Sequence, residues 1–508
     1  RHTRLQGDWS SDVCSSDLSP FASACEAAGL CFVGPTPDQL STFGNKAGAK
    51  AVASSCGVPL VPGTEGATTL AEALDFQSKH PETHLMIKAV HGGGGRGMRI
   101  VAAGEDLTKT FERCASEAEM AFGNPALYVE ALLDDVRHVE VQILGDGQGG
   151  VTHLWERECS VQRQNQKLLE VAPCPNLPES TRQGLLEAAL KMASSAHYRG
   201  LGTFEFLVPV NAPETFYFIE ANARLQVEHT VTEAITGLDL VSLQLKVAEG
   251  ATLAELGLTA PPAAQGYAIQ ARINMEVLSD KGFFKPSGGT ISQYTPPQGP
   301  GIRVDGMGYA GYTTSTRYDS LLAKVITHSR STDFELAVKK LCRALREFHL
   351  TGFRTNQSFL LHMLGEAAFA EGRINTRYVD THLKEIAKAL AETASEPSSP
   401  ARASGQSIAG ARIDANDPLA VLSHSKQAAE KPKDALADDV PSGMLAVRAP
   451  LQGTVIEWLV KEGDEVFEGQ QVAIMDAMKM EHVIQAPQSG TIETLNADLG
   501  RSEEHTSE

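Results

Sequence analysis

Apolar and polar positions follow two different periods along most of the chain. From residue 19 to about 388, short apolar runs with strand character, such as 85–90 and 216–219, alternate with longer stretches of helical spacing. This order predicts a mixed α/β fold. Between about 389 and 442 the composition shifts to Ala, Ser, Pro and charged residues, which predicts a flexible linker.

A sequence repeat follows the linker. The segment 449–455 reads APLQGTV, and it returns 37 residues later as APQSGTI at 486–492. Two similar strand-and-turn units in tandem predict a small quasi-symmetric β domain, and the segment that joins them should form a hairpin. The tetrapeptide Ala477-Met478-Lys479-Met480 lies at the predicted tip of that hairpin.

This tetrapeptide resembles the carrier motif of the biotinyl domains of biotin-dependent carboxylases. The related lipoyl domains share the fold but lack the paired methionines. The resemblance covers about 443–500, and its one small departure is Asp476, where the family more often has glutamate. It implies that Lys479 is the site of biotin attachment. An exposed lysine fits that role, because a ligase must modify it and the bound cofactor must move between distant sites.

Both ends of the chain look like translated sequencing adapter. Residues 501–508, RSEEHTSE, match one strand of a common adapter, and residues 8–18, DWSSDVCSSDL, match its reverse complement. We therefore expect residues 1–18 and 501–508 to be assembly artefacts and exclude them from the fold argument. We also expect the gene to extend beyond both ends, so that the biotinyl domain over 443–500 is incomplete.

Composition excludes several classes of function. The net charge of -19 over 508 residues argues against a nucleic-acid surface. No apolar run approaches the ~18 residues of a membrane span, so no membrane association is expected. Eight scattered cysteines without metal-ligand spacing suit a reducing cytoplasm, which is the predicted location.

A glycine-rich segment lies between two predicted strands. Residues 85–90 and 98–101 read as strands, and 91–97 between them reads HGGGGRG. Walker and Rossmann loops lead into a helix, so this order favours a flexible hairpin lid instead. Glycines leave backbone N–H groups free to approach phosphate oxygens, and Lys88 and Arg96 add positive charge.

Acidic residues emerge from strongly apolar strands further along the chain. Glu205 follows 202–204, and Glu220 and Asn222 follow 216–219. Burying carboxylates without partners is unfavourable, whereas a hard cation would satisfy them. Their oxygen atoms suit Mg²⁺ that carries ATP phosphates.

These motifs, in this order, resemble the biotin carboxylase branch of the ATP-grasp enzymes. The expected fold is an α/β (α+β) ATP-grasp biotin carboxylase with a C-terminal all-β domain of the biotinyl/lipoyl barrel-sandwich type. The expected domains are a remnant N-terminal lobe (19–44), the ATP-grasp domain (45–275), the biotin carboxylase C-terminal domain (276–388), the linker (389–442) and the biotinyl domain (443–500).

The resemblance also assigns roles position by position. Those expected to bind ATP are Lys46, Lys88, Gly93, Gly94, Gly95, Glu130, His138 and Gln162. The residues expected to bind the metal ion, Mg²⁺ or Mn²⁺, are Glu205, Glu220 and Asn222. Arg224, Gln226, Val227 and Glu228 would hold bicarbonate, Lys167 would lie near phosphate and bicarbonate, and Arg303 would stabilise an enolate-like biotin; Glu228, Arg224, Lys167 and Arg303 form the expected catalytic set.

The implied reaction has two stages. ATP phosphorylates bicarbonate after Glu228 removes its proton, and the resulting carboxyphosphate breaks down to CO₂ and phosphate. The enolate-like biotin then attacks CO₂, and the carboxylated biotin on Lys479 leaves for a second site. The linker keeps the biotin at high effective concentration near both sites.

Two residues depart from the family pattern on the nucleotide side. Asn165 stands where histidine is usual, and Ala131 stands where a lysine is common beside the adenine-contacting glutamate. Their effect on ATP contacts is left open by the sequence.

The linker points to a subgroup. About 60 residues separate Leu383 from Met444, which leaves no space for an additional β domain. This favours an acetyl/acyl-CoA carboxylase α chain or a single-chain enzyme with a carboxyltransferase after the biotinyl domain. Pyruvate carboxylase and urea carboxylase types remain open, as does a carbamoyl-phosphate-synthase-like enzyme, although the last has no use for the 477–480 motif. A non-catalytic carrier or scaffold is the other alternative. The expected partners are a carboxyltransferase, biotin protein ligase, bicarbonate and further copies of the chain.

Overall fold

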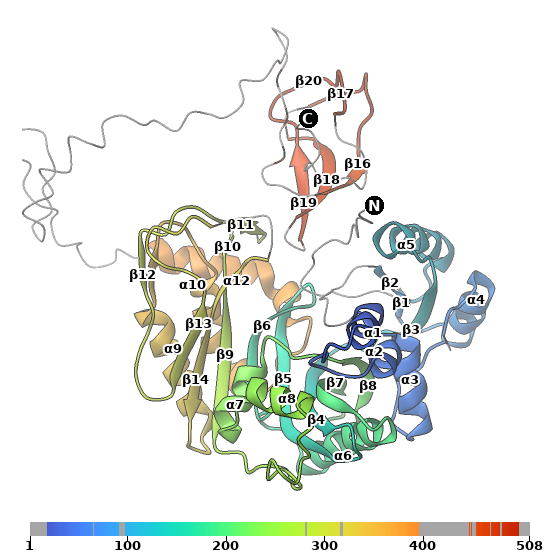
Figure 1. Cartoon of the computed structure of the whole chain (residues 1–508). Helices are drawn as coiled ribbons and strands as arrows, with labels where there is room; N and C mark the ends of the chain where they lie inside the picture. Colours follow the sequence, from blue (N-terminus) through green and yellow to red (C-terminus); the bar gives the residue numbers. More distant parts are fainter. Residues whose placement is uncertain are drawn as a thin grey trace, which may run out of the picture. The chain divides into compact units, whose positions relative to one another are not determined.

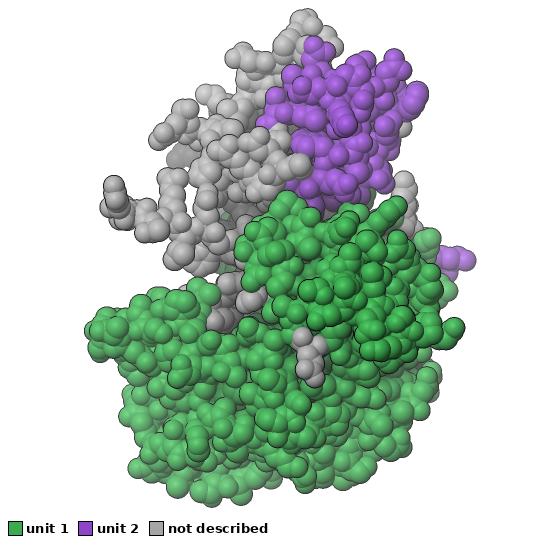
Figure 2. Space-filling view, turned by 90° about the vertical axis from the view of Figure 1, so that its right-hand side faces the viewer, with its two compact units in different colours: residues 1–387, 476–480 green, residues 388–475, 481–508 purple. Residues whose placement is uncertain are grey.

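The computed structural model describes most of the chain and divides it into two units. The described residues are 18–64, 66–90, 97–279, 282–314, 319–395, 445, 447, 449, 454–467, 469–477 and 480–496. Unit 1 comprises residues 1–387 with 476–480, and unit 2 comprises residues 388–475 with 481–508 (Figure 2). Within the described residues, no helix is both long enough and apolar enough to cross a bilayer.

An eight-stranded sheet is the frame of unit 1 (Figure 1). Its order is β13-β14-β9-β6-β5-β4-β7-β8, and each neighbouring pair is antiparallel. The strands are β4 (Val136–Asp146), β5 (Val151–Arg163), β6 (Gln166–Ala172), β7 (Arg199–Pro209), β8 (Tyr217–Asn222), β9 (Tyr267–Asn274), β13 (Ile302–Gly306) and β14 (Leu321–Ser329). Two small sheets, β10 (Glu276–Leu278) with β11 (Phe284–Pro286) and β12 (Gln293–Thr295) with β15 (His349–Thr351), lie outside it.

The two faces of the central strands differ in chemistry. Every residue of β4 is buried. Alternate positions such as Val139 and Phe204 join a core with Leu185 and other residues of α6 (Glu179–Ser195). Because successive side chains point to opposite faces, the intervening positions, which include Glu140 and Glu205, lie together on the other face. This charged face, although buried, carries most of the predicted site.

Helices of unit 1 start at side-chain caps in several places. Thr36 and Thr69 form capping boxes with Gln39 and Glu72, which satisfies backbone N–H groups at the first turn. The helices are α1 (Ser19–Ala27), α2 (Pro37–Phe43), α3 (Lys46–Ser55), α4 (Leu70–Lys79), α5 (Leu107–Phe122), α6, α7 (His229–Thr236), α8 (Leu240–Ala248), α9 (Phe334–Glu347), α10 (Gln357–Gly365), α11 (Ala367–Ala370) and α12 (Tyr378–Ser395).

A small lobe, residues 70–131, has a sheet and a core of its own. The sheet order is β2 (Met98–Val101), β1 (Leu85–Ala89) and β3 (Leu127–Ala131), and α4 and α5 pack on it. The predicted hairpin is confirmed, because β1 and β2 pair antiparallel with Lys88 opposite Met98. Gly93, Gly94 and Gly95 lie outside the described residues.

The linker begins later than the composition predicts. Residues 389–395 belong to α12, which ends at Ser395. Ala and Leu are strong helix formers, and they continue the helix past residue 388, where the sequence analysis ended the domain. The expected start at 389 is therefore too early, and 396–442 lie outside the described residues.

Unit 2 contains most of a small β domain, although the adjoining ends of two of its strands, 476–477 and 480, are counted in unit 1. Its strands are β16 (Thr454–Trp458), β17 (Glu465–Val466), β18 (Gln471–Ala477), β19 (Met480–Gln485) and β20 (Gly490–Thr491). Val466 from the first repeat and Ala486 from the second share one apolar core. β18 and β19 are neighbours in one sheet, and only Met478 and Lys479 lie between them, outside the described residues.

Candidate active site

Three carboxylates lie in a row across adjacent strands of the large sheet. Glu140 of β4 is paired in register with Glu205 of β7, and Glu205 is paired with Glu220 of β8. Side chains directly opposite each other on antiparallel strands are neighbours on one face. Three like charges in such a row repel one another unless cations lie among them, so this row requires positive partners or ligands.

Lys167 of β6 is the main partner of the row. Its Nζ lies 2.6 Å from Glu140 Oε2, 2.6 Å from Glu228 Oε1 and 3.5 Å from Glu205 Oε1. The side chain of Glu140 is fully buried and that of Glu228 is 1% exposed. Burial alone would lower the pKa of Lys167, but the surrounding anions outweigh it and raise the pKa well above its usual range. Lys167 is therefore a permanently charged centre of the site.

Two arginines complete this buried network. Arg157 is fully buried, and its Nε lies 2.5 Å from Glu140 Oε1. Arg272 bridges Glu170 at 2.5 Å and Glu228 at 3.1 Å. Burial opposes ionisation of Glu228, yet Lys167, Arg272 and Arg157 together hold its pKa well below the usual range. Glu228 is therefore a carboxylate at neutral pH.

The expected metal ligands are brought together with His138. His138 Nε2 lies 2.6 Å from Glu205 Oε2, and Asn222 Nδ2 donates to Glu205 Oε1 at 2.6 Å. Glu220 lies opposite Glu205 on the neighbouring strand. Burial opposes ionisation of Glu205, yet Lys167 and His138 outweigh it and lower the pKa of this carboxyl. These oxygen donors on one face form a set that fits a hard divalent cation.

The described residues expected to bind ATP lie on five elements, α3, β1, β3, β4 and β5. Lys46 is the first residue of α3, and its Nζ lies 3.3 Å from Glu220 Oε2. Gln162 of β5 lies beside His138, with Nε2 3.3 Å from His138 Nδ1. Lys88 of β1 forms an ion pair with Glu130 of β3. Lys46 therefore lies beside the expected metal ligand Glu220, whereas Lys88 pairs with Glu130 within the small lobe.

Glu130 has a second partner that the sequence analysis did not single out. Lys50 Nζ lies 2.7 Å from Glu130 Oε2 and 4.3 Å from the ring centroid of Tyr128. Burial would raise the pKa of Glu130, but Lys88 and Lys50 outweigh it and lower the pKa to about 2. Lys50 lies one helical turn after Lys46, a spacing that places both on one face of α3 and could have identified it.

The expected bicarbonate residues occupy the segment between β8 and α7. Arg224 Nη2 lies 3.5 Å from Asn222 Oδ1, at the edge of the metal set. Gln226 is buried, and its Nε2 has no hydrogen-bond partner among the described residues. A buried N–H without a partner is unfavourable, so a ligand oxygen at this position would stabilise the segment. Glu228 follows at the N-terminal end of α7.

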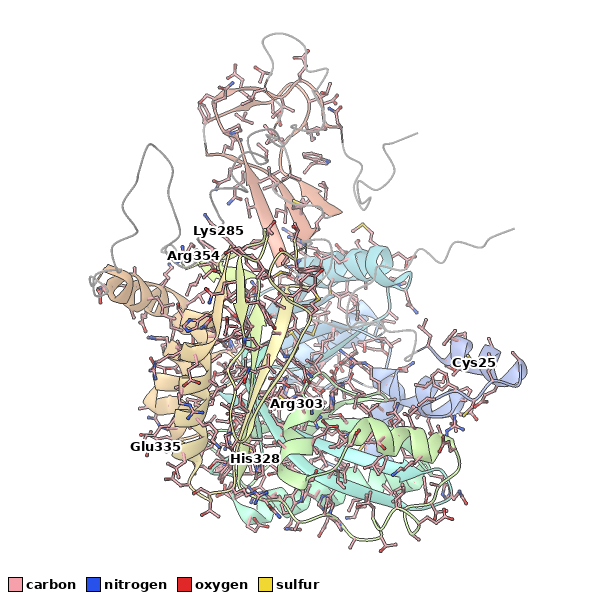
Figure 3. The ribbon with its side chains drawn as sticks, turned by 60° about the vertical axis from the view of Figure 1, so that its left-hand side comes forward. Cys25, Lys285, Arg303, His328, Glu335 and Arg354 are labelled. Carbon is pink, nitrogen blue, oxygen red and sulfur yellow. The ribbon has the colours of Figure 1, made fainter. Side chains whose placement is uncertain are left out.

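Arg303 lies on β13, apart from the buried network. Its Nη1 is 2.6 Å from Glu233 Oε2, and its Nε is 2.8 Å from Asp305 Oδ1. The side chain is 48% exposed. A cavity of about 580 Å³ opens beside it, lined by α7, β13 and β14, with His328 on its wall (Figure 3). Arg303 is thus held by two carboxylates but remains open to a ligand.

Four residues of the buried network were missed by the sequence analysis: Glu140, Arg157, Glu170 and Arg272. A signal was present for two of them. Polar residues alternate with apolar ones at 138–142 and at 269–274, which places ionisable side chains on one strand face. That alternation normally indicates a solvent-facing side, whereas here the charged face is buried. Lys479 and the glycines of the hairpin are the predicted site residues that lie outside the described part of the chain.

Comparison with known families accounts for most of the chain. A model described as the carbamoyl-phosphate synthase L chain, ATP binding domain, matches residues 45–256. The biotin carboxylase C-terminal domain matches 270–381, and the model described as biotin-requiring enzyme matches 445–504. The last two matches disfavour the carbamoyl-phosphate-synthase-like alternative, because that reading gave no role to the 477–480 motif.

Individual proteins agree with this assignment. A pyruvate carboxylase of Aspergillus terreus is 46% identical over 367 residues, which cover 72% of this chain and 30% of that protein's length. The biotin carboxylase domain dimer of Hydrogenobacter thermophilus 2-oxoglutarate carboxylase, in complex with MgADP, ADP and bicarbonate, is 38% identical, with a TM-score of 0.68 and coverage of 73% and 80%.

A third relative matches both units. A single-chain, multi-domain long-chain acyl-CoA carboxylase is 34% identical with a TM-score of 0.63, and the match covers 96% of this chain and 42% of that one. The ATP-grasp fold, the biotin carboxylase C-terminal domain and the biotinyl sequence therefore occur together. The chain belongs to the biotin-dependent carboxylases.

Proposed function

We propose that this chain catalyses the ATP- and bicarbonate-dependent carboxylation of biotin carried on Lys479. The observation that carries the proposal is the buried network in which Lys167 joins Glu140, Glu205 and Glu228. Such a cluster of charges is costly to maintain without a catalytic use. Two residues before Glu228 in the chain, the side-chain amide nitrogen of Gln226 has no hydrogen-bond partner among the described residues. The biotin carboxylase C-terminal domain model, which matches 270–381, also supports the proposal.

Magnesium and ATP would bind at the sheet face. Glu205, Glu220 and Asn222 would hold Mg²⁺, which when bound neutralises charge on the ATP phosphates. Lys46 lies 3.3 Å from Glu220, so it is already positioned beside these ligands. Lys88 would exchange its ion pair with Glu130 for contact with ATP phosphate. Glu130, His138, Gln162 and the hairpin glycines Gly93, Gly94 and Gly95 complete the proposed nucleotide site.

Bicarbonate would bind at the segment 224–228. Arg224 offers a planar guanidinium that suits the planar anion, and Gln226 Nε2 offers a free N–H. Glu228 accepts the proton of bicarbonate. A carboxylate with so low a pKa is a weak base, so this transfer is favourable only while Arg224 and Lys167 balance the new charge on the substrate.

Phosphoryl transfer follows from this arrangement. An oxygen of the deprotonated bicarbonate forms a bond to the γ-phosphorus of ATP, and the bond from that phosphorus to the β–γ bridging oxygen breaks, which releases ADP. Lys167 lies between Glu228 and Glu205, so it stabilises negative charge on both sides of the transfer. Carboxyphosphate then yields CO₂ and phosphate.

Biotin on Lys479, when attached, would supply a ureido nitrogen that bonds to CO₂ while its N–H proton passes to the phosphate released from carboxyphosphate. Arg303 is the proposed stabiliser of the negative charge that develops on the ureido oxygen. Its 48% exposure and the adjacent cavity leave it accessible to a ligand that arrives from solvent. The flexible attachment allows the same biotin to reach a carboxyltransferase afterwards.

The acceptor of the carboxyl group is proposed from the relatives. Pyruvate is the first candidate, because the similar Aspergillus terreus protein is a pyruvate carboxylase. The expectation of an acetyl-CoA acceptor, drawn from linker length, is not supported by that relative. The region that matches, however, is 30% of the relative's length.

A longer acyl-CoA is the second candidate acceptor. The long-chain acyl-CoA carboxylase matches 96% of this chain, with the biotinyl domain included, whereas the pyruvate carboxylase match covers 72%. Assays with pyruvate, acetyl-CoA and a long-chain acyl-CoA, each with the carboxyltransferase encoded by the intact gene or its neighbours, separate these candidates.

The proposed partners are that carboxyltransferase, biotin protein ligase and a second copy of the chain. The related 2-oxoglutarate carboxylase domain is a dimer, which supports the last of these. A cytoplasmic location stays a proposal, supported by free thiols at the seven cysteines among the described residues.

Two assays test the proposed function. Streptavidin blotting of the protein from its intact gene, co-expressed with biotin ligase, should detect biotin on wild type and none on Lys479→Arg. Bicarbonate-dependent ATP hydrolysis should be present in wild type and in the exposed control Glu335→Gln, and absent in Glu228→Ala. Equal hydrolysis by Glu228→Ala and wild type would reject the catalytic proposal and favour a non-catalytic carrier.

A further inference from the structure

Lys324 of β14 contacts both the segment assigned to bicarbonate and Asp305, an ion-pair partner of Arg303. Its Nζ donates to the backbone oxygen of Val227 at 3.0 Å and lies 3.4 Å from Asp305 Oδ2. Val227 lies between Gln226 and Glu228, in the segment assigned to bicarbonate. Lys324 is 13% exposed, so its contacts are mostly shielded from water. This lysine was not singled out by the sequence.

Strand pairing fixes Lys324 beside Asp305. The two residues are direct partners in the antiparallel ladder of β13 and β14. Arg303 lies two positions before Asp305 on β13, so both side chains lie on the same face. Asp305 therefore faces two cations at once, Arg303 through Oδ1 at 2.8 Å and Lys324 through Oδ2 at 3.4 Å.

The contacts form one continuous line. It runs from the Val227 carbonyl through Lys324 and Asp305 to Arg303, whose other end is held by Glu233 at 2.6 Å. Glu233 in turn accepts from the backbone N–H of Leu240 at 2.9 Å, at the start of α8. The Asp305–Arg303 link lies within β13, and the other links join β14 to the segment at Val227, β14 to β13, and β13 to α7. The line therefore connects α7, β13 and β14 beside the cavity.

The charges along this line are consistent with a positioning role. Burial lowers the pKa of Lys324, and the neighbouring carboxylate of Asp305 opposes that shift. Burial likewise raises the pKa of Asp305, and Arg303 and Lys324 reverse it. A lysine that served only to neutralise Asp305 would not need a bond to a carbonyl in the bicarbonate segment. Neutralisation of Asp305 therefore does not account for the bond from Lys324 to the Val227 carbonyl.

We propose that Lys324 is a positioning residue for the bicarbonate segment 224–228. In this proposal Asp305 joins Lys324 to Arg303, so that the bicarbonate segment and Arg303 keep a fixed spacing. The proposal rests on the proposed function for the identity of the ligands. Lys324 itself touches neither substrate. It holds the peptide that orients Gln226 and Glu228, while Asp305 orients the guanidinium of Arg303.

Lys324→Met tests the proposal by removing both bonds while retaining the apolar stem. Loss of a charge-assisted hydrogen bond should raise KM for bicarbonate about tenfold, with KM for ATP changed less than about twofold. Lys324→Arg, which can still donate to the carbonyl, should restore most of the bicarbonate affinity. Asp305→Asn should instead reduce biotin carboxylation per ATP hydrolysed, because Arg303 loses its partner.

A matched control is available on α9, which contains Lys340. Lys340 Nζ also donates to a backbone oxygen of β14, that of His328, at 2.6 Å, but this carbonyl lies away from the bicarbonate segment. Lys340→Met should leave KM for bicarbonate unchanged. An equal rise in Lys340→Met and Lys324→Met, or equal rises in KM for both substrates, would overturn the positioning role.

Hydrogen exchange measures the same contact without any activity. In Lys324→Met the amides of 225–232 should exchange faster than in wild type, while peptides of α5 should not change; Lys324→Arg should resemble wild type. Unchanged exchange at 225–232 would overturn the inference. If wild type lacks bicarbonate-dependent ATP hydrolysis, the proposed function fails, and the exchange experiment still decides whether Lys324 positions this segment.

Discussion

The large sheet and the small lobe hold two predicted site lysines, the catalytic Lys167 and the ATP-binding Lys88, in different ways. Lys167 on the sheet faces three carboxylates, two of them at 2.6 Å, within a network that also includes buried arginines. Lys88 in the small lobe pairs with Glu130, and Glu130 is shared with Lys50. The sheet lysine is held by three carboxylates at once, whereas the sharing of Glu130 by two lysines in the small lobe leaves one lysine replaceable. This difference suggests a fixed bicarbonate site and an adaptable nucleotide site.

Removal of Lys167 should have the largest effect. Lys167→Met leaves Glu140, Glu228 and Glu205 facing one another, which should reduce the free energy of unfolding by about 3–5 kcal/mol and abolish bicarbonate-dependent ATP hydrolysis. Urea denaturation and the ATPase assay measure the two effects. Lys339→Met, which removes a 64% exposed lysine, should change neither. A stable Lys167→Met protein with normal turnover would remove the contrast between the sheet and the small lobe.

The Glu130 carboxylate should stabilise the small lobe in a pH-dependent way. Its pKa is lowered from 4.5 to about 2, so its contribution is fully present above pH 4.5 and is lost as pH falls toward 2. That shift corresponds to roughly 3 kcal/mol at neutral pH. Unfolding of wild type and Glu130→Gln should therefore differ most at pH 7 and converge on acidification. A difference that stays constant from pH 7 to pH 3 would contradict the ion-pair account.

Lys88→Met should impair nucleotide binding more than stability. Lys50 still pairs with Glu130, so the free energy of unfolding should fall by less than the roughly 3 kcal/mol expected for loss of the Glu130 carboxylate itself. KM for ATP should rise about tenfold if Lys88 contacts phosphate. The control is Lys79→Met, which removes an exposed lysine of the same lobe. A large loss of stability in Lys88→Met, with unchanged KM for ATP, would make the Lys88–Glu130 pair structural.

Substitution of Asn165 by histidine should have the smallest effect on the free energy of unfolding. Gln164 and Asn165 form the turn between β5 and β6 with φ of 46° and 64°, and Asn and His are both enriched in this left-handed region. Asn165→His, the residue usual in the family, should therefore alter stability by less than about 0.5 kcal/mol. Asn165→Val should reduce it by about 1–2 kcal/mol because a β-branched side chain is strained there. Equal stability of the two variants would contradict this backbone explanation.

The sequence predicted the fold and the candidate site residues more completely than it predicted the residues with which those site residues form ion pairs. The glycine hairpin was predicted because it is a local pattern, and the strand pairing confirms it. The proposed metal ligands on β7 and β8 and the proposed bicarbonate segment were also read from local patterns, and their roles stay predictions. Glu140, Arg157 and Arg272 were missed because their roles depend on pairing between strands distant in sequence. Glu140 lies opposite Arg157 on one side and Glu205 on the other, a register that no local motif contains.

Helix propensity explains a second difference between the sequence prediction and the structure, the position at which the linker begins. The alanine-rich stretch after residue 388 was read as linker from its composition, whereas α12 continues to Ser395. The turn between β5 and β6 tolerates the departure at Asn165, because asparagine accepts positive φ as readily as the histidine that is usual there. Lys324 was missed for the same reason as Glu140, since its partner Val227 is 97 residues away.

Transfer of label from radioactive bicarbonate to the chain tests the central claim most directly. The biotinylated protein from the intact gene should retain acid-labile label after gel filtration when ATP and Mg²⁺ are present. Omission of ATP, Glu228→Ala or Lys479→Arg should each abolish the label, while Glu335→Gln should retain it. Equal labelling of Lys479→Arg and wild type, or no labelling of fully biotinylated wild type, would contradict the account.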